Sequence, residues 1–186
     1  MSALFNPLRC HPSLSSPPAV RVEGAASFDD AGDLAVDFEL SGDLAALRVP
    51  PPGPAHPADG LWQHTCLEVF AATMDGEAYR EFNFSPSGSW AAYAFTRYRE
   101  RQPDFAPGTP PALLALHGEG RLSLGAIIPA AALPRERPLR LGLSAVLESR
   151  NGSLSYWALA HPAPQPDFHD HRGFVLVCPG PAPSDP

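Results

Sequence analysis

The fold of this chain is decided by residues 65–97, which read TCLEVFAATMDGEAYREFNFSPSGSWAAYAFTR. Three runs of strand-forming residues are separated by two turn sequences, Met74–Glu77 and Pro86–Ser89, and this pattern favours two consecutive β-hairpins. Counting outward from the turns predicts which residues face each other. The predicted pairs on one face are mostly apolar, so that face should lie on the core: Leu67 with Phe84, Val69 with Phe82, Ala71 with Arg80, Phe84 with Trp90 and Phe82 with Ala92.

The same register gathers polar and aromatic side chains on the opposite face. Glu68 is predicted to lie opposite Asn83, and Glu81 to lie between Phe70 and Tyr93. Two carboxylates, an amide and aromatic rings on one face suit a concave binding pocket. A solvated face that exposes a few aromatic rings is the alternative, and the pattern does not separate the two.

Alternation of apolar and polar residues continues along the rest of the chain, and one helical turn is predicted at Pro129–Leu133. The 24 prolines lie mainly between these segments, where they disfavour long helices. We therefore expect an all-β fold, an antiparallel β-sandwich of about ten strands, immunoglobulin-like or jelly-roll-like, over residues 18–178. Residues 1–17 are predicted to be an N-terminal extension and 179–186 a Pro-rich tail. The further strands are expected at Val20–Gly24, Leu34–Leu40, Leu113–Gly118, Leu122–Ile128, Leu139–Leu147, Leu154–His161 and Gly173–Cys178.

Composition excludes several classes of function. The net charge is −7, with 13 arginines and no lysine, and no basic cluster is present that would attract nucleic acid or a membrane surface. Chemistry that needs a lysine, such as a Schiff base or a phosphate-binding loop, is excluded as well. Three widely spaced cysteines argue against a disulfide framework. Residues 1–20 lack the pattern of a secretory signal, so we expect a cytoplasmic protein.

Two central segments, LWQHTCLEVF at 61–70 and YREFNFSPSGSWAAY at 79–93, carry a resemblance to a known family. Later segments fit it too: YWAL at 156–159, His161-Pro162 and PDFH at 166–169. The chain resembles the bacterial DOMON-like proteins related to the family 9 carbohydrate-binding modules, over roughly residues 19–177. The resemblance implies a β-sandwich that binds a small polyhydroxylated ligand, a carbohydrate or sugar derivative, on one sheet.

The resemblance also implies roles for particular residues. Such modules grip a terminal sugar between tryptophans and hold its hydroxyls with charged and amide side chains. Trp62 and Glu68 match the family's first tryptophan and its nearby acid. Trp157 is the late candidate for the second tryptophan, and Phe168 is a substitute wall because Trp157 falls inside a predicted strand. The predicted ligand-binding residues are Trp62, Glu68, Glu81, Asn83, Tyr93, Trp157 and Phe168.

Two of these residues, Trp62 and Glu81, also have a structural interpretation. Trp62 would instead close one end of the sandwich, and Glu81 would pair internally with an arginine. We expect a protein that is not an enzyme, because no nucleophile elbow, phosphate loop or dinucleotide fingerprint occurs. A small enzyme acting on a sugar derivative is the alternative, since Glu68 and Glu81 would form a carboxylate pair of the glycosidase kind.

A haem- or metal-binding domain is the other alternative. DOMON domains that bind haem use Met and His ligands, but the only internal methionine here is Met74, in a tight turn. The most metal-like cluster is His161, Asp167, His169 and His171. Calcium occurs among the carbohydrate-binding relatives, yet no dense acidic loop is present. We therefore expect no cofactor, and the oligomeric state stays open.

Overall fold

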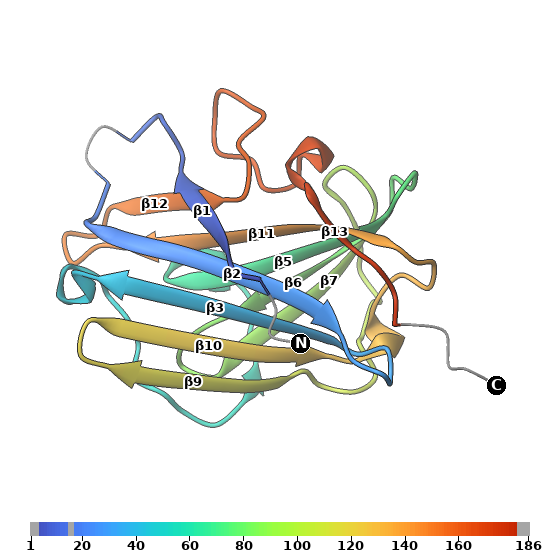
Figure 1. The fold of residues 1–186 in the computed structure, drawn as a ribbon, viewed down its shortest axis with the longest axis horizontal. Coiled ribbons are helices and arrows are strands. Elements are labelled where there is room, and N and C mark those ends of the chain that lie inside the picture. Colours follow the sequence, from blue (N-terminus) through green and yellow to red (C-terminus); the bar gives the residue numbers. More distant parts are fainter. Residues whose placement is uncertain (1–3, 15–16, 182–186) are drawn as a thin grey trace.

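The computed structural model describes residues 4–14 and 17–181 and is nearly all β (Figure 1). Helical residues in this part of the chain are confined to four short 3₁₀ turns, η1 (Leu44–Ala46), η2 (Leu61–Gln63), η3 (Ala130–Ala132) and η4 (His171–Gly173). The strands are β1 (Asn6–Cys10), β2 (Val20–Phe28), β3 (Leu34–Gly42), β4 (His56–Pro57), β5 (Cys66–Thr73), β6 (Tyr79–Phe84), β7 (Ser89–Arg97), β8 (Glu100–Gln102), β9 (Ala112–Gly118), β10 (Arg121–Ile128), β11 (Leu139–Glu148), β12 (Leu154–Ala158) and β13 (Leu176–Cys178). None of the described helices is long and apolar enough to cross a membrane.

The strands form one continuous, curled sheet. Its order is β4-β7-β6-β5-β11-β12-β1-β2-β3-β10-β9, with β13 paired to β11 and β8 paired to β7. All neighbours run antiparallel except β4, which is parallel to β7. Figure 1 shows β2, β3, β10 and β9 crossing in front of β5, β6 and β7, as in a half-barrel. The predicted all-β class is confirmed. The expected purely antiparallel sandwich is replaced by one mixed sheet that curls over itself.

The main core fills the space inside the curl. Alternate residues of β3, such as Phe38, share one buried cluster with residues of β5 and β11 from the other half of the sheet. Gly24 marks the close approach of the two halves, because a Cβ atom there would lie 3.0 Å from the Leu143 Cδ1 atom. Each large side chain buried in this way contributes about 1.5–3 kcal/mol. The core therefore holds the curled sheet closed.

The register of the two central hairpins is the predicted one. The observed partners include Leu67 with Phe84, Glu68 with Asn83, Val69 with Phe82, Phe70 with Glu81, Glu81 with Tyr93 and Phe84 with Trp90. The second turn is fixed by Gly88, which has a φ of +91° and faces the Gly53 carbonyl oxygen at a distance too short for a Cβ atom. Local turn chemistry was therefore enough to place these residues.

The prediction placed residues 1–17 outside the domain, but β1 is part of the sheet. It pairs with β2 on one side and, through Arg9 and Cys10, with β12 on the other. Pro7, which cannot donate a backbone hydrogen bond, lies where β1 has a partner only on the β2 side. The strand β1 was not predicted because it has only five residues and one of them is a proline. Residues 1–3 and 15–16 of the predicted extension, and 182–186 of the predicted tail, lie outside the described residues.

Other elements were predicted with different bounds or were missed. The helical turn expected at Pro129–Leu133 is η3. The strand expected at Leu154–His161 ends at Ala158, and the one expected at Gly173–Cys178 begins only at Leu176. The missed strands β4 and β8 have two and three residues, too few to show alternation.

Candidate functional site

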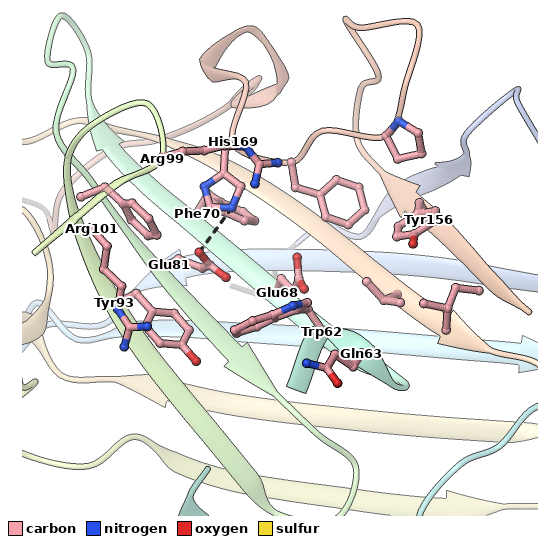
Figure 2. Close-up of a pocket in the computed structure, with 15 residues that line it drawn as sticks. Trp62, Gln63, Glu68, Phe70, Glu81, Tyr93, Arg99, Arg101, Tyr156 and His169 are labelled. Atoms are coloured by element: carbon pink, nitrogen blue, oxygen red, sulfur yellow. Dashed lines mark ion pairs between the residues drawn. The ribbon is translucent and has the colours of Figure 1, made fainter. Parts of the chain in front are cut away.

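A cavity of about 570 Å³ opens on the face of the sheet that is turned away from the main core (Figure 2). We call it the outer cavity. Its floor is made by side chains of β5, β6 and β7 that alternate with the core residues: Glu68, Phe70, Glu81, Tyr93 and Phe95. These side chains are nearly buried, between 1% and 6% exposed. The predicted polar and aromatic face is therefore the floor of a pocket and not a solvated surface.

The walls come from elements that are distant in the sequence. Trp62 and Gln63 belong to η2, which precedes β5, and Tyr156 belongs to β12. Phe168 and His169 come from the loop between β12 and η4. Arg99 precedes β8 and Arg101 belongs to it, and Figure 2 shows Arg101 beside Tyr93 and Arg99 near His169. The floor is thus local to two hairpins, whereas the walls depend on the tertiary fold.

Glu68 lies on β5 and is 2% exposed, so its carboxylate is almost fully removed from bulk water. Its one described hydrogen-bond donor among the residues of the structure is the Ser144 hydroxyl, at 3.3 Å from Oε2. Burial raises the pKa of the Glu68 carboxyl well above its usual value, the charge of Glu81 raises it further, and the Ser144 hydrogen bond opposes the change. Burial without a charged partner therefore favours the protonated, uncharged form of Glu68.

Glu81 lies on β6 beside it and is 5% exposed. Its Oε1 accepts a hydrogen bond from the Asn83 amide at 2.8 Å, and its Oε2 lies 3.8 Å from Nε2 of His169. Burial raises the pKa of the Glu81 carboxyl to about 7, while the Asn83 hydrogen bond and the charges of Arg99 and Arg101 lower it in part. At neutral pH this carboxyl is therefore about half protonated.

His169 is oriented by a chain of hydrogen bonds. The Arg99 backbone N–H donates to the Tyr79 hydroxyl at 3.1 Å, and that hydroxyl lies 2.7 Å from Nδ1 of His169. If the Tyr79 hydroxyl donates to Nδ1, a neutral imidazole carries its proton on Nε2, toward Glu81. Burial, followed by the charge of Arg99, lowers the pKa of His169 to about 4. His169 is therefore neutral at pH 7.

Aromatic rings line two sides of the cavity. Trp62 is 41% exposed and meets Tyr93 edge to face, with ring centroids 5.9 Å apart. The Tyr93 hydroxyl donates to Asp59, and the Arg101 guanidinium lies over the Tyr93 ring at 4.1 Å. On the far side Phe168 packs edge to face on Tyr156, at 6.1 Å. Trp62 thus keeps an indole face available, which distinguishes it from a plug that closes the sheet.

Five of the seven predicted ligand-binding residues line the outer cavity: Trp62, Glu68, Glu81, Tyr93 and Phe168. Asn83 is fully buried and reaches the site only through Glu81. Trp157 is not in the cavity. It lies 7% exposed in the main core, with its Nε1 donating to the Ser155 hydroxyl at 3.0 Å. Alternation along β12 turns Tyr156 outward and Trp157 inward, so the family-derived role of Trp157 is wrong for this chain.

Several lining residues were not predicted. Tyr156 could have been found, because alternation along β12 puts it opposite in direction to the buried Trp157. Arg99 and Arg101 gave no signal, because β8 is three residues long and Arg99 adopts the left-handed conformation, with φ of 55°. His169 was predicted only as a weak metal ligand.

The four metal candidates point to different partners. His161 donates from Nε2 to the Arg9 carbonyl, Asp167 accepts from Tyr98 and Arg99, and His171 stacks on Phe174. Within residues 4–14 and 17–181, no three His, Cys, Asp or Glu side chains are placed to share a metal ion. The predicted cluster is therefore not assembled in the fold.

The sequence and the fold of this chain were compared with those of known proteins. No family model matches the chain, and no curated protein matches it significantly. A candidate carbohydrate-binding protein from Bacteroides uniformis superposes with a TM-score of 0.69 and 16% identity, over 95% of this chain and 86% of the other. A family 9 carbohydrate-binding module from Caldicellulosiruptor kristjanssonii, solved with cellotriose, superposes with a TM-score of 0.59 and 10% identity, over 95% of this chain and 82% of the other. The chain shares the fold of the family 9 carbohydrate-binding modules. A family 9 module from the same organism, solved with glucose, superposes with a TM-score of 0.53 and 10% identity, over 94% of this chain and 83% of the other.

Proposed function

We propose that the outer cavity binds a small carbohydrate and releases it unchanged. The observation that carries this proposal is the half-exposed indole of Trp62 standing beside two buried carboxylates (Figure 2). A sugar ring presents an apolar C–H face and a rim of hydroxyl groups, and these match an aromatic wall and a floor of acceptors respectively. Modules of this fold from C. kristjanssonii were solved with glucose and cellotriose, which supports the same class of ligand here.

The size and chemistry of the cavity suit such a ligand. Its volume of about 570 Å³ falls in the range of small-molecule sites, about 300–1,000 Å³. A sugar whose C–H face rests on Trp62 gains about 0.5–1.5 kcal/mol beyond simple area burial. Its hydroxyls would donate to Glu68 and Glu81, and Arg101 would contribute donors from the rim. The chain is then best regarded as a DOMON-like relative of the family 9 modules.

The placement of the acids supports binding over hydrolysis. Glycosidases hold their two carboxyl groups on either side of the bond to be cleaved. Here Glu68 and Glu81 lie on the neighbouring strands β5 and β6 and point from the same face of the sheet, as diagonal neighbours. Both acids would approach a ligand from below, which favours recognition of its hydroxyls.

Isothermal titration calorimetry with glucose, cellobiose and cellotriose tests the proposal. We expect saturable binding to the wild-type chain. Trp62→Ala should weaken it tenfold or more, about 1.4 kcal/mol, because the stacking face is lost. Leu116→Ala is the matched control, since Leu116 is an exposed apolar residue on the edge strand β9. The sugar affinity of the Leu116→Ala protein should equal that of the wild type.

Two results would overturn the proposal. One is the absence of saturable heat with all three sugars. The other is an unchanged affinity in the Trp62→Ala protein, provided that its thermal unfolding shows it to be folded.

A further inference from the structure

The floor of the outer cavity carries two acids without a bonded cation. Among the described residues, the one basic group within 4 Å of either carboxylate is His169, at 3.8 Å from Glu81. That histidine is neutral at pH 7 because burial lowers its pKa to about 4. Glu68 and Glu81 are therefore buried acids whose ionised forms have no partner of full positive charge.

The two arginines of the cavity do not fill this role. Arg99 donates to a carboxylate oxygen of Asp167 at 2.9 Å and to the Tyr98 hydroxyl at 3.2 Å. Arg101 has its guanidinium over the ring of Tyr93. Figure 2 shows Arg99 near His169 and Arg101 beside Tyr93, both at the edge of the site. Their charges act on Glu81 from a distance, and neither guanidinium forms an ion pair with Glu68 or Glu81 in the described part of the chain.

Aromatic rings surround the same space. Phe70 is part of the floor, directly opposite Glu81 and two residues from Glu68 along β5, and Trp62 and Tyr93 line the same cavity. An ammonium group is attracted by the faces of aromatic rings and donates three hydrogen bonds, most strongly to carboxylates. A hydroxyl group donates one hydrogen bond and brings no charge. A cavity of this composition is thus better matched to a protonated amine than to a neutral sugar.

We propose that the ligand of the outer cavity is an amino sugar whose protonated amine lies against Glu68 and Glu81, with the sugar ring on Trp62. This inference rests on the proposed carbohydrate-binding function and narrows it to a chemical class. Burial raises the pKa of both carboxyls, and a bound ammonium would lower these pKa values again and hold the acids ionised. A metal ion fits less well, since no third ligating side chain is placed with them in the described part of the chain.

The test compares sugars that share one ring and differ in charge. Wild-type protein is titrated at pH 7 with glucosamine, N-acetylglucosamine, glucose and glucuronate. Glucosamine should bind at least tenfold more tightly than glucose, a difference of about 1.4 kcal/mol. N-Acetylglucosamine keeps the nitrogen but lacks the charge, so it should bind no more tightly than glucose. Glucuronate should bind most weakly, because its charge is repelled by the floor.

Isosteric variants assign the effect to the two acids. In Glu68→Gln and Glu81→Gln the ratio of glucosamine affinity to glucose affinity should fall toward one. This ratio is unmoved by a general weakening of the site, and Glu119→Gln, an exposed change in the turn between β9 and β10, should keep it at the wild-type value.

The outcomes distinguish the amino-sugar inference from the proposed carbohydrate-binding function. Equal binding of glucosamine and glucose, or tighter binding of glucuronate, would overturn the amino-sugar inference and leave carbohydrate binding intact. An unchanged ratio in both glutamine variants would remove the roles of Glu68 and Glu81. Failure of every sugar to bind the wild-type protein would overturn the proposed function itself.

Discussion

The substitution Glu81→Gln should stabilise the fold at pH 8 but not at pH 4.5. The pKa of the Glu81 carboxyl is raised from 4.5 to about 7 by burial, so the folded chain holds a proton that the unfolded chain loses in this range. Stability therefore falls as pH rises from about 4.5 to 7. At about 1.4 kcal/mol for each pH unit, the loss is about 3 kcal/mol. A glutamine has nearly the same shape, keeps an acceptor for Asn83 and does not ionise.

The wild-type curve alone would hide this effect. The pKa of His169 is lowered from 6.5 to about 4, so the folded chain binds fewer protons than the unfolded chain in that range, and stability rises with pH between about 4 and 6.5. The contributions of His169 and Glu81 have opposite signs over most of this range. The difference between variant and wild type removes the common contribution of His169 and leaves the contribution of Glu81 together with its effect on the coupled carboxyl of Glu68.

Urea unfolding followed by tryptophan fluorescence provides the measurement, since Trp90 and Trp157 are both buried. The free energy of unfolding of Glu81→Gln, relative to wild type, should grow by about 3 kcal/mol between pH 4.5 and 8. The exposed change Glu119→Gln should stay within about 0.5 kcal/mol of wild type at each pH. If the difference in unfolding free energy between Glu81→Gln and wild type does not vary with pH, the wild-type Glu81 carboxyl ionises with its usual pKa. The description of a desolvated floor would then be wrong.

Two further substitutions test residues next to the cavity. Trp157→Phe should lower the free energy of unfolding by about 1–3 kcal/mol, because Trp157 fills the core, yet leave sugar affinity within about twofold by calorimetry; a large loss of affinity in a folded variant would restore Trp157 to the site. Tyr79→Phe removes the hydroxyl that joins the Arg99 N–H to His169, and it should cost about 1–3 kcal/mol in urea unfolding. Tyr156→Phe is the control for Tyr79→Phe, because the Tyr156 hydroxyl makes no hydrogen bond within the described residues, and equal stabilities of the two variants would contradict the proposed hydrogen-bond chain.

How far the sequence predicted the site depends on the distance between partners along the chain. Glu68 and Glu81 were placed on one face because a four-residue turn joins their strands and fixes the register. His169 was not placed beside Glu81, because its partner Tyr79 is 90 residues away. Trp157 was misassigned for a different reason. The resemblance suggested a second tryptophan, although alternation in β12 would have pointed to Tyr156.

The sequence by itself determined most of the longer strands, the register of the central hairpins and the gathering of acids and rings on one face. Those features follow from side-chain alternation and turn chemistry, which act over a few residues. Only the tertiary structure decided that this face becomes the floor of a cavity. Trp62, Arg99 and His169 reach it from η2, from the segment before β8 and from the loop after β12, and such non-local contacts depend on how the whole sheet curls around its core. Burial by those segments also changes the pKa values of the acids, because removal from water is a property of the assembled fold.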